Sequence, residues 1–282
     1  MQKLFIFGLG YVSGHLAAAL KTEFKIIGTS REAKPNTIIW DGESANSEIE
    51  NELESADAVL ISIPPNDGGD LAYKYFNQVI KNSNIKWVGY LSTTGVYGDH
   101  QGGMVSEDTP LNAQNMRAKR RILAENQWLG CVSDNCAVNI FRLPGIYGAG
   151  RSVFDALAAN RAKRIDMRLN NGDKHFFCRA HVADIVQVIK ASLKKGLSGT
   201  NIYNIVDDLP APNADIVEFA ANMLSVDIPP LLSEAQANMS EMAKSFYAEC
   251  KHMQNDKIKN TLGITLKYKD YKQGLAAIWQ QK

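Results

Sequence analysis

Short apolar runs alternate with helical patterns through the first half of the chain. The runs are mostly continuous rather than alternating with polar positions, which is typical of strands covered on both faces. The predicted strands are residues 3–7, 25–29, 38–40, 58–62, 87–92, 137–142 and 201–206. Helices are predicted between them at residues 12–21, 44–54, 71–82 and 114–128. This alternation predicts an α/β fold of the Rossmann type, with a doubly wound parallel sheet.

The alternation breaks after residue 142. A glycine-rich loop at 144–150 leads to a predicted helix near 152–161, and another helix is predicted at 182–194. We therefore expect residues 1–150 to form a dinucleotide-binding domain, to which segments near 180–206 return. Residues 151–282 are expected to form mainly a smaller, mostly helical substrate-binding region, packed across the ends of the strands.

The first predicted strand runs directly into Gly8-Leu9-Gly10-Tyr11-Val12-Ser13-Gly14. In the pattern G-x-G-x-x-G, the first glycine permits a sharp turn and the second lets the backbone approach a phosphate. The third position holds Ser13, with Gly14 one place late. Because such a turn aims N–H groups and a helix N-terminus at one point, we interpret Gly8, Gly10, Tyr11, Val12 and Ser13 as a pyrophosphate-binding site. A tight turn without a ligand is the alternative.

The end of the second predicted strand indicates which dinucleotide is bound. An NAD site usually places an acidic residue there, whereas an arginine suits the 2′-phosphate of NADP. This chain has Ser30 and Arg31 at that point, and both can bind a phosphate. NADP is therefore the predicted cofactor and NAD the second choice. A solvated loop arginine is the alternative reading of Arg31.

Three further residues complete the predicted cofactor site. Asp41 follows the third predicted strand and either reaches the adenine or forms an ordinary turn with Gly42. Ser62 and Pro64 stand at the end of the fourth predicted strand, next to the glycine turn in a doubly wound sheet.

Composition and charge narrow the expected partners. The chain has 282 residues, with 31 Lys and Arg against 30 Asp and Glu, so a net charge of +1 gives no reason to expect nucleic acid or an anionic membrane. No apolar run approaches the roughly 18 residues of a membrane helix, and no signal peptide is expected, which favours the cytoplasm. The four cysteines lack C-x-x-C spacing, so neither a zinc site nor a disulfide framework is predicted.

Motifs along the whole chain carry a resemblance to a known family. After the glycine turn come Ser92-Thr-Thr-Gly-Val-Tyr-Gly98, the strand end of residues 141–150, His181-Val-Ala-Asp184 and the Leu-Gly element of residues 258–263. The chain resembles the extended short-chain dehydrogenase/reductase superfamily, of the sugar-nucleotide epimerase and dehydratase type, and within it an atypical NAD-dependent epimerase/dehydratase-like bacterial branch. The resemblance implies hydride transfer with a nicotinamide cofactor, a small-molecule substrate, and a monomer or homodimer.

The resemblance also implies catalytic positions, one of which is altered. Thr93 takes the role of the hydroxyl that orients the substrate, with Thr94 and Ser92 as near alternatives. The family's Tyr-x-x-x-Lys pair, counted back from Glu125, falls on Arg117 and Arg121. Arginine cannot donate a proton near neutral pH, because its pKa exceeds about 12.

The two arginines are four residues apart, hence on one helical face with Ala124 and Trp128. We expect them to clamp a phosphate or carboxylate, or Arg121 to contact the cofactor ribose. A solvated basic patch that pairs with Glu125 is the alternative. Tyr97 is close in sequence to Thr93 and is a candidate proton donor, although packing or lining the cofactor is the alternative role.

Five residues are candidates for the substrate side. Arg142, Tyr147 and Arg151 lie where the resembled family places substrate contacts. Arg179 and His181 alternate on one strand face, so both are expected to point into the cleft. Arg151 and Arg179 would bind an anionic group such as a nucleotide diphosphate, and a structural role before the next helix is the alternative for His181.

Overall fold

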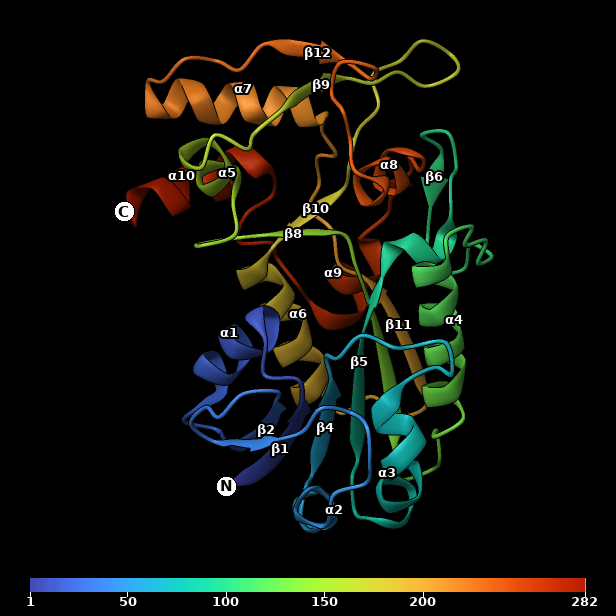
Figure 1. Ribbon diagram of the computed structural model, residues 1–282. Helices are drawn as coiled ribbons and strands as arrows, with labels where there is room; N and C mark the ends of the chain where they lie inside the picture. Colours follow the sequence, from blue (N-terminus) through green and yellow to red (C-terminus); the bar gives the residue numbers. More distant parts are fainter. Residues whose placement is uncertain (282) are drawn as a thin grey trace.

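The computed structural model describes residues 1–281 and contains a central parallel sheet with helices on both faces (Figure 1). Its strand order is β11-β7-β5-β4-β1-β2-β3, and every neighbouring pair is parallel. The strands are β1 (Gln2–Phe7), β2 (Phe24–Ser30), β3 (Thr37–Ile39), β4 (Ala58–Ile61), β5 (Trp87–Thr93), β7 (Ala137–Leu143) and β11 (Thr200–Asn204). The predicted α/β class and doubly wound sheet are confirmed.

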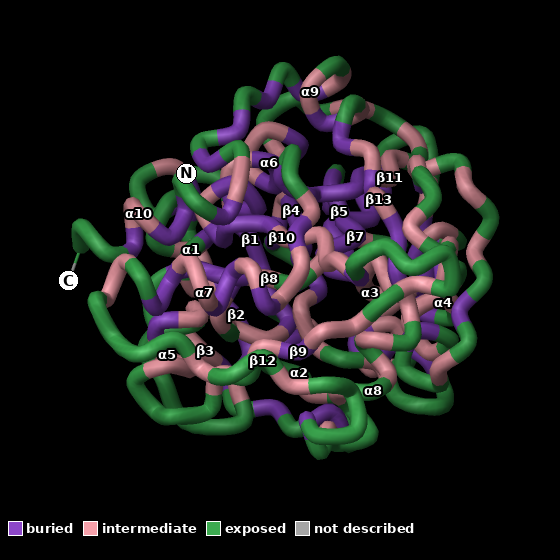
Figure 2. Tube along the Cα trace, turned by 90° about the horizontal axis from the view of Figure 1, so that it is seen from above, coloured by how far each residue is buried: buried purple, intermediate pink, exposed green. Residues whose placement is uncertain are grey.

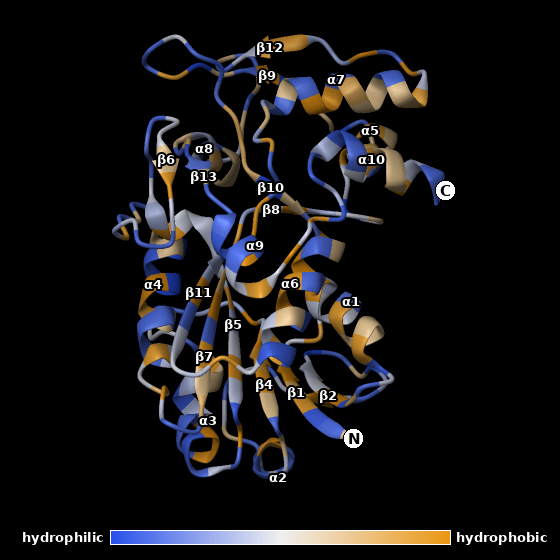
Figure 3. Ribbon diagram, turned by 180° about the vertical axis from the view of Figure 1, so that it is seen from behind, coloured by the Kyte–Doolittle hydropathy of each residue, from blue (hydrophilic) through white to orange (hydrophobic). Residues whose placement is uncertain are grey.

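The continuous apolar runs are explained by burial on both faces of the sheet. Every residue of β4 and of β7 is buried. The strands of the sheet are coloured mainly as hydrophobic in Figure 3, and the buried residues in Figure 2 gather at the centre of the molecule. Because side chains alternate between the two faces, each strand contributes residues to two separate hydrophobic layers, one on each side of the sheet.

Each layer is closed by helices. On one face lie α1 (Tyr11–Leu20), α6 (Val182–Lys195) and α9 (Asp256–Leu262), which contribute Leu16, Ile185 and Ile258 to the core. On the other lie α2 (Ser47–Glu54), α3 (Leu71–Asn82) and α4 (Met116–Leu129), which contribute Ile49, Phe76 and Trp128. The sheet and its covering helices thus include β11, α6 and, from near the end of the chain, α9.

The order of the strands reverses at β1. This strand pairs with β2 on one side and with β4 on the other, with Phe7 opposite Ile61 near the ends of the two strands. In a doubly wound sheet, the crevice at such a reversal opens at the carboxyl ends of the strands and is where ligands bind. The glycine turn follows β1 at this position.

A second layer lies across the carboxyl ends of the strands, at the top of Figure 1. It contains α5 (Val153–Ala158), α7 (Asn213–Leu224) and α10 (Tyr271–Gln280), which share a hydrophobic cluster with Phe154, Ile216 and Leu275. The short strands β9 (Arg164–Asp166) and β12 (Leu231–Ser233) form a parallel pair beside α7. The sequence predicted a mostly helical region here, and did not predict this pair.

Two more short parallel pairs and one helix border the space between the layers. They are β8 (Gly145–Tyr147) with β10 (Arg179–His181), β6 (Met104–Val105) with β13 (His252–Met253), and α8 (Glu241–Tyr247). The helix predicted at 152–161 ends at Ala158, and Asn160 adopts a left-handed φ of 51°. The helix predicted at 44–54 begins at Ser47, because the Asn46 side chain accepts hydrogen bonds from the first-turn amides.

No helix within residues 1–281 has the length and apolar character needed to cross a bilayer. The four cysteines are free thiols. Across the same residues, no group of His, Cys, Asp and Glu side chains is arranged to hold a metal ion.

Candidate functional site

The glycine turn is held in place by the neighbouring strand. Gly8 has a φ of +86°, and a Cβ there would lie 2.8 Å from Cγ2 of Ile63. The Gly8 N–H donates to Oγ1 of Thr29 at 2.9 Å, and the Leu9 N–H donates to the Thr29 carbonyl at 2.8 Å. Thr29, at the end of β2, therefore fixes the turn from the side, a role that the sequence analysis did not assign to it.

The turn presents the N-terminus of α1 to an open space. Gly10 is the N-cap residue, and no side chain among residues 1–281 caps the first-turn amides. A Cβ built on Gly10 would meet no atom within 4 Å, so any larger side chain would project into this space. Free amides at the positive end of a helix dipole are a ready site for phosphate groups.

Two residues predicted for this site contribute no side chain to it. Val12 is buried in the hydrophobic core, and the Ser13 hydroxyl donates to the Gly8 carbonyl at 2.9 Å. Ser13 thus joins helix to strand, and only the backbone amides of these two residues remain for a ligand. Tyr11 points toward the second layer, where its hydroxyl donates to the carbonyl of Ala149 at 3.0 Å.

A groove of about 380 Å³ extends from the glycine turn along the ends of β1, β2 and β4. It brings together Gly8, Gly10, Ser30, Arg31, Asp41, Ser62 and Pro64, all predicted for the cofactor site. Lys34 also lines it, which makes a second cation beyond β2 that the sequence analysis did not name. Asp41 both lines the groove and makes an Asx turn, since its carboxylate accepts from the Glu43 N–H at 2.9 Å.

The residues present fit a dinucleotide. The turn supplies free amides and a space that a side chain at Gly10 would fill, which suits a pyrophosphate. Arg31 and Lys34 are exposed cations that line the same groove, and such side chains suit phosphate groups.

A larger cleft of about 750 Å³ lies beyond the groove, at the end of β5 and between the two layers. Thr93 and Thr94 line it, together with residues of α4, α8 and β10. The Thr93 hydroxyl is half-buried and accepts from the Gly95 N–H at 3.2 Å, so its own proton stays available. Ser92, the other alternative for this role, is buried and bonds to Glu125 instead.

Arg117 and Arg121 line this cleft, one helical turn apart on α4. Arg121 is anchored through Nη1, which donates to the Leu91 carbonyl at 2.8 Å, the Tyr90 hydroxyl at 3.0 Å and the Ile63 carbonyl at 3.3 Å. The Arg117 guanidinium is exposed and stacks over the Phe246 ring at 5.1 Å. Neither arginine pairs with Glu125, which was the alternative for this basic stretch, because Glu125 has other partners.

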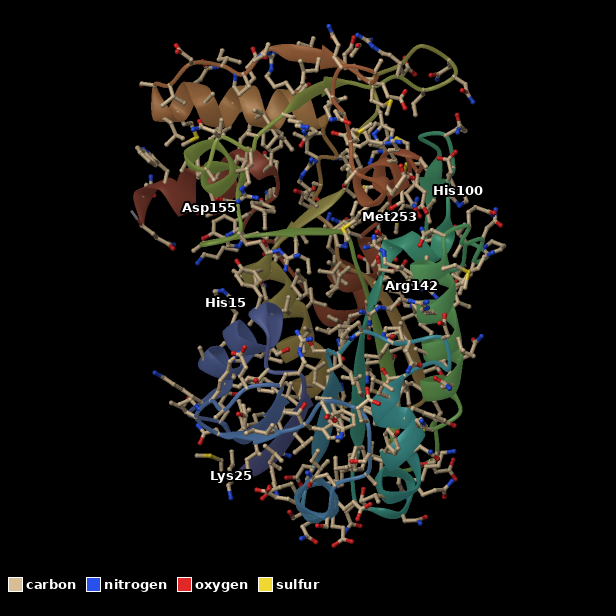
Figure 4. The ribbon with its side chains drawn as sticks, viewed as in Figure 1. His15, Lys25, His100, Arg142, Asp155 and Met253 are labelled. Atoms are coloured by element: carbon tan, nitrogen blue, oxygen red, sulfur yellow. The ribbon has the colours of Figure 1, made fainter. Side chains whose placement is uncertain are left out.

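Two predicted site residues, Arg142 and Tyr97, belong to the network around Glu125 and not to the cleft. Arg142 is buried behind the cleft against α4 (Figure 4), where its Nη2 bonds to Oε2 of Glu125 at 2.8 Å. Its Nη1 donates to the Tyr97 hydroxyl at 2.7 Å, and that hydroxyl donates to Asn204 at 2.8 Å. Neither Arg142 nor Tyr97 lines the cleft, since both belong to a closed network that joins β7, α4 and β11.

The pKa values within this network agree with a structural role. Burial lowers the pKa of Arg142, but its hydrogen bond and charge interaction with Glu125 outweigh burial and raise it overall. Burial raises the pKa of Tyr97, although the nearby Arg142 opposes the shift. The arginine thus stays charged and the phenol neutral.

His181 also differs from the prediction that it points into the cleft, because its side chain caps a helix. Its Nδ1 accepts from the Ala183 N–H at 3.1 Å at the start of α6, and its ring packs between Tyr147 and Tyr268. Burial, with smaller contributions from Lys267 and His15, lowers its pKa to about 4. The side chain is therefore neutral at physiological pH, and it does not line the cleft.

The other substrate-side residues are divided between two cavities. Tyr147 lines a separate cavity of about 580 Å³ beside α5 and α7, and burial raises the pKa of its phenol. Arg151 and Arg179 line both this cavity and the cleft. Arg179 is held by its Nη1, which donates to the carbonyls of Phe177 and Ala211 at 3.0 and 2.9 Å. Burial lowers its pKa from the usual value.

The second layer supplies cleft residues that the sequence analysis did not identify. Tyr247 and Phe246, from α8, and Glu249 and Lys251 after it all line the cleft. The Tyr247 ring packs edge-on against Phe177 at 4.9 Å, and burial raises the pKa of its phenol while Arg179 opposes the shift. No motif marks α8, so only its position in the fold could have identified these residues.

Comparison with solved structures defines the relationships of the chain. A functionally unknown conserved protein from Silicibacter pomeroyi DSS is 37% identical, with 100% of this chain and 99% of that one covered and a TM-score of 0.88. dTDP-glucose 4,6-dehydratase from Bacillus anthracis, in complex with NAD, is 18% identical over 99% and 96% of the two chains, with a TM-score of 0.77. Human epimerase family protein SDR39U1, with NADPH, is 15% identical over 100% of both chains, with a TM-score of 0.75.

No protein-family model matches the sequence, and a search of curated proteins finds no match. The more distant structures show the fold, and the Silicibacter pomeroyi protein is similar enough to show kinship. The chain belongs to the same family as that conserved protein, and it has the fold of the NAD-dependent epimerases and dehydratases of the extended short-chain dehydrogenase/reductase type.

Proposed function

We propose that this protein binds NADP, with NAD as second choice, and catalyses an oxidoreductase or epimerase/dehydratase-like reaction on a hydroxyl or carbonyl compound. One observation carries the proposal: Pro64 lines both the groove at the glycine turn and the cleft at Thr93. The groove and the cleft therefore adjoin at Pro64, and we infer that a dinucleotide in the groove would place its nicotinamide end at the cleft, where a substrate would meet it. The structural neighbours bind NAD or NADPH, and their names point to nucleotide sugars as the first substrates to test.

A bound nicotinamide would accept or supply the hydride. In the oxidative direction, the substrate carbon loses a hydride and its hydroxyl loses a proton, which gives a carbonyl group. Thr93 would orient the reacting oxygen with its hydroxyl proton, and the arginines on α4 would bind charge on the substrate.

In the reductive direction, the hydride adds to the carbonyl carbon and the oxygen takes up a proton, which needs a donor other than the tyrosine on α4 that the resembled family uses. Tyr247 is the one tyrosine that lines the cleft within residues 1–281, and burial raises the pKa of its phenol and so keeps it protonated, which makes it our candidate donor. Replacement of Tyr247 by Phe should reduce turnover about 10²- to 10⁴-fold, as expected for the loss of general acid–base help, and leave dinucleotide affinity unchanged. Unchanged turnover would remove Tyr247 from the mechanism.

A second candidate function is a dinucleotide-binding regulator or redox sensor without catalysis. The arginines at positions 117 and 121, in place of a proton-transferring pair, favour it. In either case we expect a small-molecule ligand and a monomer or homodimer, which light scattering after size exclusion would determine.

Two measurements separate these functions. NADPH and NADH binding is followed by cofactor fluorescence, and the absence of any response to both would contradict both proposals. Turnover is then tested on a panel of carbonyl compounds and nucleotide sugars with wild type and Thr93→Ala. Turnover in the wild type that is lost in the variant supports the enzyme, whereas binding without turnover supports the regulator.

A further inference from the structure

The cleft is lined by more positively charged than negatively charged side chains. Arg120 pairs with Asp67 at 2.6 Å, and Lys251 pairs with Glu249 at 2.7 Å. The second oxygen of Glu249 accepts from the Asn115 amide at 2.9 Å, so this carboxylate is fully used. Within residues 1–281, no carboxylate lies within 4.0 Å of the guanidinium of Arg117, Arg121 or Arg179. The cleft therefore holds an excess of positive charge that favours an anionic ligand.

Two of these arginines lie where the reaction would occur. Nη1 of Arg121 donates to the Leu91 carbonyl of β5, two residues before Thr93, and to the Ile63 carbonyl, next to Pro64 in the shared wall. Nε and Nη2 of Arg121 have no hydrogen-bond acceptor in the described part of the chain. Arg121 is thus fixed at one end and free to donate at the other, at the junction of groove and cleft.

Arg117 extends the same face by one turn toward α8. Its guanidinium lies over the Phe246 ring and so is oriented by a flat apolar surface, and it forms no ion pair with a carboxylate of the described chain. A planar fork held in this way matches a planar carboxylate with two parallel hydrogen bonds. Arg179, in contrast, comes from β10 in the second layer and is at the other side of the cleft opening, shared with the neighbouring cavity.

We propose that the substrate carries a carboxylate beside the carbon that exchanges hydride, and that Arg117 and Arg121 bind this group. The proposal rests on the proposed function and names its substrate class, an acidic sugar or another hydroxy acid. The arginines act as binding residues only, because a guanidinium group is a hydrogen-bond donor without an acceptor site. The diphosphate of a nucleotide sugar is the competing source of negative charge, and the test separates the two.

The test compares ligands that differ only in the acid group. Calorimetric titration of the full-length protein, with and without NADP⁺, uses UDP-glucuronate against UDP-glucose, and then free glucuronate against glucose and lactate against propanol. We expect each acid to bind about tenfold or more tightly than its neutral counterpart, as charge-assisted hydrogen bonds predict. Equal affinity within every pair, or no binding of any acid, would overturn the proposal.

Variants assign the preference to α4. Arg117→Gln should abolish the preference for the acid, and Arg117→Lys should retain part of it, because a point charge replaces a planar fork. Lys119→Gln is the matched control, since it removes the same charge from an exposed position of the same helix outside the cleft lining. If Arg117→Gln still bound the acids more tightly than their neutral counterparts, Arg117 would not be the residue that binds the carboxylate, and the proposal would be contradicted.

Cofactor binding keeps this result distinct from the proposed function. NADPH fluorescence is measured on each variant, and we expect wild-type affinity in Arg117→Gln, which also shows that the variant is folded. If the wild type binds no dinucleotide, the proposed function fails whatever the acids do. If dinucleotide binding is normal and the acids are not preferred, only the present proposal fails.

Discussion

The groove at the glycine turn and the cleft at Thr93 adjoin, but different parts of the residues form them. The groove is made largely of backbone and short side chains, from segments that all precede residue 72. The cleft is made of long side chains, and residues from β5, α4, β10 and α8 each supply part of it. A backbone site keeps its chemistry when the sequence changes, whereas a side-chain site changes with each substitution.

The groove departs from the G-x-G-x-x-G pattern at Ser13, whereas the cleft has arginines at positions 117 and 121, where the resemblance would place tyrosine and lysine. The groove needs two glycines, an uncapped helix and a few polar residues, all of which are present. The cleft has two arginines at the expected proton-transfer positions and draws its tyrosine from another layer of the molecule.

The largest effect should come from breaking the support of the cleft. Glu125→Ala leaves Arg142 buried without its partner, and such a loss costs about 3–5 kcal/mol of unfolding free energy. Urea denaturation measures it. Arg120→Ala is the control, because its pair with Asp67 is exposed to solvent and contributes about 0–1 kcal/mol. Similar losses in the two variants would contradict the structural role of the network.

The next largest effect should come from a substitution that blocks the groove and leaves the fold intact. Gly10→Val places a side chain in open space where the pyrophosphate would bind, so NADPH affinity should fall by about a hundredfold, equivalent to about 2.7 kcal/mol. Gly14→Ala is the control within the same helix, since its Cβ also meets no atom but lies beyond the groove lining. It should bind normally, with slightly higher stability. Normal NADPH binding by Gly10→Val would place the pyrophosphate elsewhere.

A smaller effect should show that His181 has a structural role outside the cleft, through the pH dependence of the free energy of unfolding. Its pKa is about 4 when folded and about 6.5 when unfolded, so between these values the unfolded chain binds more protons and stability falls as pH falls. His181→Asn retains a capping side chain and cannot be protonated. Relative to this variant, the wild type should lose on the order of 1–2 kcal/mol between pH 7 and pH 4, after allowance for partial contact with solvent. Urea denaturation at both pH values that shows no difference would indicate a charged His181.

The smallest effect concerns the choice between the two dinucleotides. Arg31→Ala removes an exposed cation near the expected 2′-phosphate, so NADPH affinity should fall about fivefold while NADH affinity stays constant. Lys25→Ala, on β2 but outside the groove, is the control. Equal losses for both cofactors would show that Arg31 does not contact the phosphate.

The sequence predicted most of what depends on neighbouring residues. The strands, the helices of the sheet layer and the glycine turn follow from apolar runs and from Gly8 and Gly10, which act locally. It did not predict that Arg142 pairs with Glu125 and that Tyr97 bonds to Arg142, away from the cleft, because the direction of a side chain near a strand end depends on what packs against it. Nor did it find Tyr247, because α8 reaches the cleft only through the packing of the second layer.

The buried network around Glu125 has a consequence for how the active site can evolve. It fastens α4 to the sheet through Ser92 and Arg142, and neither residue 117 nor residue 121 takes part in that network. Arg121 adds hydrogen bonds to Tyr90 and Leu91 of β5, whereas Arg117 makes no hydrogen bond to the sheet in the described part of the chain, so the attachment of the helix does not depend on residue 117. The side chain at position 117 can therefore change without loosening α4 from the sheet, so the cleft can alter its chemistry at this position while the protein framework is retained.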